Sequence, residues 1–184
     1  MKIRPRRLLI VPLMALLAGT VLAEQQVSLL GYTASVPDHW VAETPKSEMR
    51  KLQFKVPASA GDGAELIVYY FGPGQGGTLE ANIERWQSQF QGPAGAAVTP
   101  IVTAIGSEAI PATLVELSGR YGRSVGMGPS DAVLEDRMLL AGIIETPEGN
   151  LFPQMHGPAE LVAAQREGFI AFVRSLSPAA AATP

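Results

Sequence analysis

The runs LIVYYF at residues 66–71 and MLLAGII at residues 138–144 contain no charged side chain and no proline. Runs of this length, rich in branched and aromatic side chains, are typical of strands that are covered on both faces. A third run, LQFKV at residues 52–56, alternates apolar and polar residues, as a strand with one solvated face does. These three segments predict a sheet with central strands inside the domain.

Two further segments have the spacing of helices that pack on a sheet. The first follows Thr78, a suitable N-cap, and we expect it to end near residue 91. Its apolar face is formed by Leu79, Ile83, Trp86 and Phe90. The second is expected from Pro158 to about residue 176, because proline suits the first turn of a helix. Its apolar face is formed by Val162, Phe169, Phe172, Val173 and Leu176.

The remaining apolar segments give the order of the elements. Strands are expected at residues 27–36 with a break at Gly31, and at residues 98–105, 113–121 and 151–156. Most of the connections are short turns, which join antiparallel neighbours. We therefore predict an α+β fold, with an antiparallel-dominated sheet flanked by two main helices.

The segment GYTASVPDHW at residues 31–40 resembles the opening of proteins in the Mog1/PsbP-like superfamily, in which a strand runs into a Pro-x-x-Trp turn. The closing helix, with Phe169, Phe172, Ser175 and Leu176, is similar to their C-terminal helix. The resemblance extends over the chain in the order of its elements. It implies an α/β/α sandwich that serves as a binding or assembly module, and it transfers no functional residue.

The two ends of the chain differ from the middle. Four basic residues in positions 1–7, an apolar segment at residues 8–18 and a V-x-A site ending at Ala23 predict a secretory signal peptide. An uncleaved membrane anchor is the alternative, but residues 8–23 are fewer than the about 20 that a spanning helix needs. Arg6-Arg7 keeps a twin-arginine route open beside the general one. We expect a signal peptide at residues 1–23, one domain at residues 24–177 and a disordered Ala/Pro tail at residues 178–184.

Composition limits the functions that the chain can have. It has 184 residues, no cysteine and a net charge of −3. Removal of the four basic residues of the signal leaves 10 basic against 17 acidic residues, a net charge of −7. Such a charge does not suit nucleic acid, whose phosphates need a basic patch, or an anionic membrane. The absence of cysteine excludes thiolate metal sites and a cysteine nucleophile. We expect an exported protein, periplasmic or extracellular, without a membrane span after signal cleavage.

Two glycine-rich motifs suggest chemistry. GPGQGG at residues 72–77 is literally G-x-G-x-x-G between a strand and a helix, the context of a dinucleotide fingerprint. Two facts count against dinucleotide binding. Pro73 lacks the backbone N–H that would contact phosphate, and no acidic residue ends a second parallel strand about 20 positions further on. We interpret the motif as a turn that needs positive φ angles, and as a candidate binding loop with Gly72, Gly74, Gly76 and Gly77.

GRSVG at residues 122–126 is literally G-x-S-x-G and follows a strand. With Ser124 as nucleophile, Asp131 or Asp136 as acid and His156 as base, the order is that of α/β-hydrolases. The sequence MGP that follows cannot start a good helix, which a nucleophile elbow requires. The competing interpretation is a glycine-rich surface loop, in which Gly122 and Gly126 could contact a ligand.

No metal site or cofactor is expected, because His39 and His156 lie far apart and neither has a neighbouring histidine at metal-binding spacing. Trp86 fits the apolar face of its helix better than a ligand platform. The sequence therefore predicts a non-catalytic module that binds an exported protein or a small ligand through the two glycine-rich loops. The alternative is an exported serine hydrolase that uses Ser124, Asp131 and His156.

Overall fold

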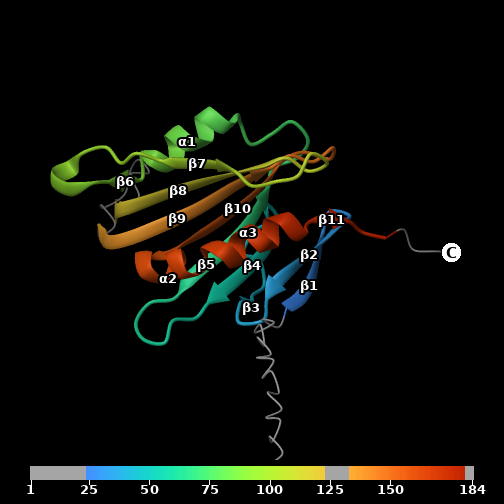
Figure 1. Cartoon of the computed structure of the whole chain (residues 1–184), viewed down its shortest axis with the longest axis horizontal. Helices are drawn as coiled ribbons and strands as arrows, with labels where there is room; N and C mark the ends of the chain where they lie inside the picture. The colour runs from blue at the N-terminus through green and yellow to red at the C-terminus, as the bar shows by residue number, and fades with distance from the viewer. Residues whose placement is uncertain (1–23, 123–132, 181–184) are drawn as a thin grey trace, which may run out of the picture.

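The computed structural model describes residues 24–122 and 133–180. Its central layer is an eight-stranded sheet with the order β3-β4-β5-β10-β9-β8-β6, in which β7 also pairs with β8 (Figure 1). The strand pairs described for this sheet are antiparallel. Its strands are β3 (Val41–Ala42), β4 (Arg50–Val56), β5 (Ala64–Tyr70), β6 (Phe90–Gln91), β7 (Ile101–Ala104), β8 (Ala112–Tyr121), β9 (Leu134–Ile144) and β10 (Leu151–Pro158).

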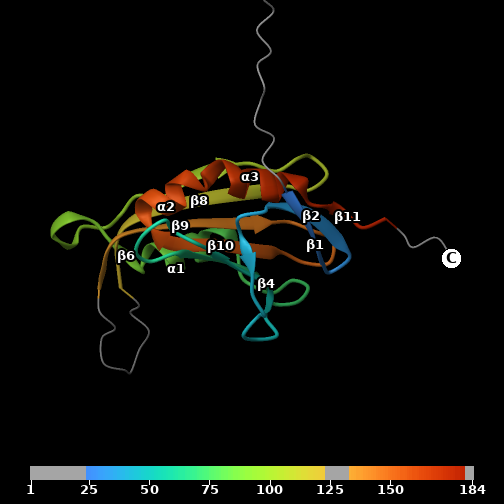
Figure 2. The same ribbon diagram turned by 90° about the horizontal axis from the view of Figure 1, so that it is seen from below.

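A smaller sheet and three helices complete the layers. The hairpin of β1 (Glu24–Leu29) and β2 (Tyr32–Pro37) pairs with β11 (Ser177–Pro178). Helices α2 (Ala159–Ala164) and α3 (Arg166–Ser175) lie on one side of the large sheet, and α1 (Leu79–Gln87) lies on the other (Figure 2). A short 3-10 turn, η1, spans Pro93–Gly95. The predicted α+β fold and its α/β/α layering are therefore confirmed.

The alternation of side chains along the strands builds two cores. The larger lies between the sheet, α3 and the β1–β2 hairpin, and contains Trp40, Phe54, Phe169 and Phe172. The smaller lies beneath α1 and contains Trp86, Phe90, Leu139 and Phe152. Both apolar runs of the sequence lie in central strands, because β5 and β9 flank β10. The predicted apolar faces of both helices are buried or partly buried in these two cores.

Several predicted boundaries differ from the structure, and three of the differences involve contacts between distant segments. Helix α1 ends at Gln87 rather than near residue 91, because Phe90 pairs with Tyr121 in the β6–β8 ladder. The closing helix is two helices that meet at Gln165, whose Oε1 accepts a hydrogen bond from Trp40 Nε1 at 2.9 Å. Pro178, assigned above to the tail, pairs with Tyr32 in β11.

Candidate functional site

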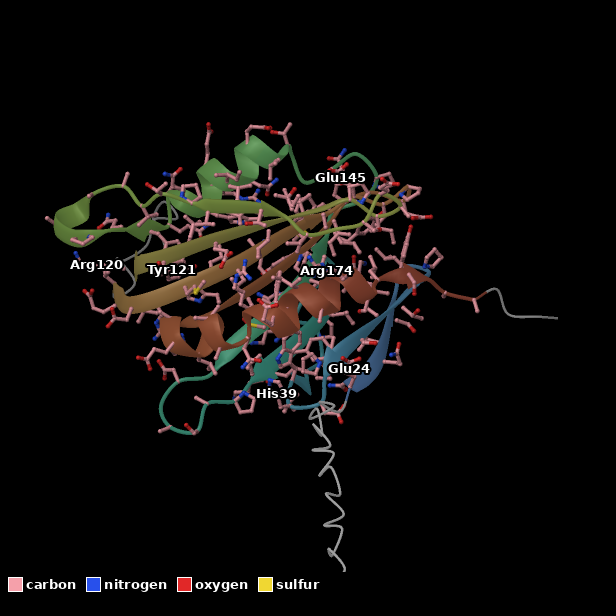
Figure 3. The ribbon with its side chains drawn as sticks, in the orientation of Figure 1. Glu24, His39, Arg120, Tyr121, Glu145 and Arg174 are labelled. Carbon is pink, nitrogen blue, oxygen red and sulfur yellow. The ribbon has the colours of Figure 1, made fainter. Side chains whose placement is uncertain are left out.

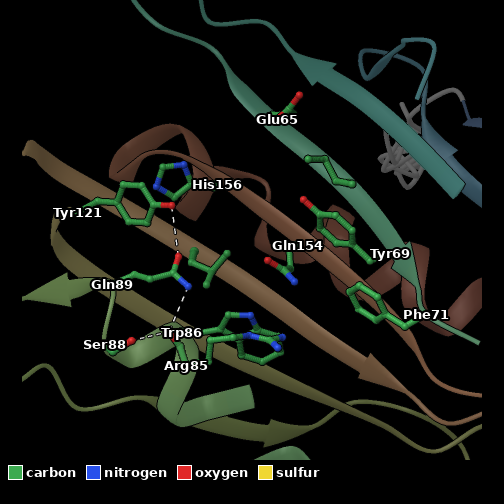
Figure 4. Close-up of a pocket in the computed structure, with 12 residues that line it drawn as sticks. Glu65, Tyr69, Phe71, Arg85, Trp86, Ser88, Gln89, Tyr121, Gln154 and His156 are labelled. Carbon is green, nitrogen blue, oxygen red and sulfur yellow. Dashed lines mark hydrogen bonds between the residues drawn. The ribbon is translucent and has the colours of Figure 1, made fainter. Parts of the chain in front are cut away.

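A pocket of about 400 Å³ opens beside α1, on the sheet face that this short helix covers only in part (Figure 4). We call it the α1 pocket. It lies over the smaller core, and its lining comes from four strands, from Phe71 after β5, and from the end of α1. The lining residues are Glu65, Ile67, Tyr69, Phe71, Arg85, Trp86, Ser88, Gln89, Tyr121, Leu139, Gln154 and His156.

The period of two along each strand places these side chains on one face. In β5, Glu65, Ile67 and Tyr69 line the pocket, whereas Leu66 and Val68 belong to the opposite core. Strand β10 is paired with β5 so that Gln154 lies opposite Ile67 and His156 opposite Glu65. These register positions bring the two polar side chains of β10 to the floor of the pocket.

One end of the α1 pocket is aromatic. The rings of Tyr69 and Phe71 are nearly parallel, with 6.0 Å between their centroids and 4° between their planes. Phe71 also contacts Phe152, with 5.5 Å between the ring centroids. Trp86 is only 1% exposed, and its Nε1 has no hydrogen-bond partner within the described part of the chain. The prediction that Trp86 is a core residue is confirmed, although its side chain also lines the pocket.

The other end is polar. The Tyr121 hydroxyl donates to Gln89 Oε1 at 3.3 Å, and Gln89 Nε2 donates to the carbonyl oxygen of Arg85 at 3.1 Å. The rings of Tyr121 and His156 lie 4.1 Å apart between centroids, and Phe90 contacts both rings. Figure 4 shows the chain of bonds from Tyr121 through Gln89 to the end of α1. Gln89 therefore ties the end of the helix to the edge of the sheet.

Two charged side chains line the pocket, and their surroundings differ. The Glu65 carboxylate accepts from Gln53 Nε2 at 3.0 Å and lies 3.9 Å from Arg50 Nη1 and 4.0 Å from Lys46 Nζ. Arg85 donates instead to the neutral side-chain oxygen of Asn82. Asn82 is fully buried, so its amide is a fixed acceptor for the guanidinium of Arg85.

The first predicted binding loop, residues 72–77, has mainly a structural role. Gly72, Gly74, Gly76 and Gly77 all have positive φ angles, as predicted for this turn. The Gly76 carbonyl accepts from Asn82 Nδ2 at 2.8 Å, and a Cβ on Gly76 would lie 2.4 Å from the Phe152 ring. The loop thus packs α1 closely against the aromatic end of the pocket. A Cβ added to Gly74 would have no atom of another residue within 4 Å apart from its chain neighbours.

The second predicted loop is described only at its start. Gly122 follows Tyr121, and its N–H donates to the Gln89 carbonyl oxygen at 3.0 Å. Ser124, Gly126 and Asp131 lie outside the described residues. The structure therefore places His156 at the polar end of the pocket and Gly122 next to Gln89, and it leaves the Ser124–Asp131–His156 arrangement untested.

Most of the pocket could not be recognised from the sequence. The apolar run places Tyr69 in a buried strand, and no motif singles out Arg85, Gln89 or Gln154. A signal was present in β10, where Gln154 and His156 interrupt an apolar strand at a spacing of two. No sequence pattern, however, related that strand to the end of α1.

Other kinds of site find little support in the described ranges. Residues 24–122 and 133–180 contain no group of three or more His, Asp or Glu side chains placed to hold a metal ion. Within the same ranges, no helix has both the length and the apolar character needed to cross a membrane.

Comparisons with known proteins found similarity in structure but not in sequence. No model of a known protein family matches the chain, and no curated protein matches its sequence. The solution structure of cyanobacterial PsbP (CyanoP) from Synechocystis sp. PCC 6803 is similar, with a TM-score of 0.53 and 15% identity over 91% of this chain and 99% of that chain. PA94 from Pseudomonas aeruginosa, a protein of unknown function, gives a TM-score of 0.48 and 17% identity over 86% and 99%.

The chain therefore has a PsbP-like fold, and the resemblance seen in residues 31–40 is confirmed at the level of fold. At 15% identity the likeness concerns the fold alone. A function has to be argued from the α1 pocket.

Proposed function

We propose that the mature chain is an exported, non-catalytic binding module that holds a small ligand in the α1 pocket. The observation that carries this proposal is the combination of an aromatic end with convergent polar side chains in one concavity. Ligand sites are typically pockets of about 300–1,000 Å³ that have apolar walls and a few placed polar groups. The volume of about 400 Å³ suits a compact molecule of one or two rings.

The proposal favours a small ligand over an exported protein partner. The loop at residues 72–77 packs against Phe152 through Gly76. It is therefore poorly suited to adapt to a protein partner. The concave sheet face beside it is enclosed on one side by α1. Export is the part of the proposal that rests on the sequence of residues 1–23.

Fluorescence of Trp86 tests the proposal directly. The chain has two tryptophans, and Trp40 lies in the opposite core, so Trp40→Phe leaves Trp86 as the only indole. This variant should be titrated with a panel of neutral, cationic and anionic one-ring and two-ring compounds. We expect saturable changes in emission for at least one class, because ligand in the pocket alters the surroundings of Trp86.

A variant that fills the pocket supplies the control. Gln154→Phe places a ring on the floor of the α1 pocket and should abolish the change, whereas Gln26→Phe in the small sheet should not. If no class of compound alters the emission, or if Gln154→Phe binds as well as its parent, the α1 pocket is not a ligand site.

A further inference from the structure

We infer that the ligand of the α1 pocket is a planar aromatic anion, such as an aromatic carboxylate, with its acid group on Arg85 and its ring among Tyr69, Phe71 and Trp86. This inference rests on the proposed function, because it names the ligand class for the same pocket. The balance of charge in the pocket and the position of its rings both favour such a ligand.

The acidic side chain of the pocket is already paired. Glu65 receives one amide hydrogen bond and lies within 4.0 Å of two cationic groups, those of Arg50 and Lys46. Its negative charge is therefore balanced by the protein itself. A cationic ligand would have to compete with both neighbours for this carboxylate, which argues against a cationic ligand.

Arg85, the basic side chain of the pocket, has no acidic partner in the described ranges. Its guanidinium bonds to the amide oxygen of Asn82, a neutral group, and within the described ranges it takes part in no ion pair. The positive charge at the rim of the pocket is therefore left for an anion. A guanidinium presents parallel N–H donors that match a carboxylate.

Arg85 is also held in place before any ligand arrives. Asn82 Nδ2 donates to the carbonyl oxygens of Gly76 and Thr78, both at 2.8 Å, which fixes the orientation of its amide. The amide oxygen then faces Arg85. Fixing a long side chain in advance lowers the entropy lost on binding.

The aromatic end of the pocket provides a place for the ring of the ligand. Trp86 follows Arg85 in the chain, and Tyr69 and Phe71 form a stacked pair across the pocket (Figure 4). Aromatic pairs prefer offset or edge-to-face contacts at centroid distances of about 4.5–7 Å, which a planar ligand can make with several of these side chains at once. A guanidinium beside an aromatic end selects a molecule with an acid group attached to a ring.

The test compares two probes that share one ring. Indole-3-carboxylate and indole-3-carboxamide have nearly the same shape and differ in charge. Isothermal titration calorimetry of the purified chain at low salt should show that the carboxylate binds about tenfold more tightly, a difference of about 1.4 kcal/mol. Because Arg85 is exposed, this preference should shrink as salt is added.

Matched variants assign the preference to named residues. Arg85→Gln should remove the preference for the carboxylate, whereas Arg174→Gln should keep it, since that arginine lies on α3 across the sheet (Figure 3). Arg85→Lys keeps the charge without the paired donors and should retain a reduced preference. Tyr69→Leu should weaken both probes equally, and Tyr70→Leu, which alters the opposite face of β5, should weaken neither.

The outcomes separate this inference from the proposed function. If the two probes bind the unmodified chain equally, or if the preference survives in Arg85→Gln, the ligand is not an anion held by Arg85, although the pocket still binds. Cyclohexanecarboxylate binding as tightly as indole-3-carboxylate would overturn the requirement for an aromatic ring. If neither probe binds while neutral compounds alter the emission of Trp86, the inference fails and the proposed function stands.

Discussion

Replacement of Gly76 by alanine should destabilise the protein much more than the same change two residues earlier in the loop. Gly76 has φ = +96°, and an added Cβ would lie 2.4 Å from Phe152 Cε2 and Cζ. Phe152 is fully buried, so its ring cannot move into solvent. A left-handed conformation costs a non-glycine residue about 1–2 kcal/mol. Overpacking of a core adds about 1–3 kcal/mol, so the free energy of unfolding should fall by about 2–5 kcal/mol.

Gly74→Ala is the matched control for this prediction. Gly74 also has a positive φ, +66°, but an added Cβ meets no atom within 4 Å. Only the conformational cost of about 1–2 kcal/mol applies to it. Urea unfolding followed by far-ultraviolet circular dichroism measures both variants. A loss below about 1 kcal/mol for Gly76→Ala, within the range of surface substitutions, would refute the close packing of this loop on Phe152. Equal losses in the two variants would refute it as well.

Trp86→Ala should lower the free energy of unfolding by about 3–5 kcal/mol in the same assay, because it empties a buried aromatic site. Tyr32→Phe should raise the pKa of Glu148, which is lowered from its ordinary value of 4.5 chiefly by the hydrogen bond from the Tyr32 hydroxyl. A carboxyl group whose pKa is lowered in the folded state stabilises that state above the unfolded pKa, and this stabilisation is lost as the pH falls through the folded pKa. Below pH 4.5 the melting temperature of Tyr32→Phe should therefore fall less than that of the unmodified protein. Intact mass spectrometry of the exported fraction should find a chain that begins at Glu24, and a chain that retains Met1 would contradict signal cleavage. A fluorophosphonate probe should leave the purified protein unlabelled, and labelling that disappears in Ser124→Ala would establish the hydrolase alternative instead.

The layers of the fold could be predicted because local patterns and tertiary packing agree there. Residues 66–68 of the continuous apolar run are buried in a central strand, and the alternating run at residues 52–56 belongs to a strand nearer the edge of the sheet. The spacing of Phe169, Phe172 and Val173 matches the face that α3 turns to the core. Side-chain periodicity depends on the backbone alone, so it can be read without knowledge of the neighbours.

The ends of the elements could not be predicted in the same way, because they depend on contacts between distant segments. Gln165 separates α2 from α3 while its side chain bonds to Trp40, which lies 125 positions earlier. Pro178 extends the ordered chain by pairing with Tyr32, although an Ala/Pro-rich sequence has little local preference for structure. Both contacts join segments that are remote in sequence, where a single sequence carries no signal of proximity.

The α1 pocket arises at the position where the predicted helix is too long. Phe90 lies on the expected apolar face of the helix and is indeed buried, but it reaches the core from β6, where it pairs with Tyr121. The change of direction after Gln87 lets the Gln89 side chain bond to the Tyr121 hydroxyl, which joins the end of α1 to the edge of the sheet. Helix α1 has only nine residues, and Tyr69, Phe71 and the residues at the end of the helix line one pocket instead of packing closed. The same early end of α1 that contradicts the local pattern therefore creates the concavity to which we assign the function.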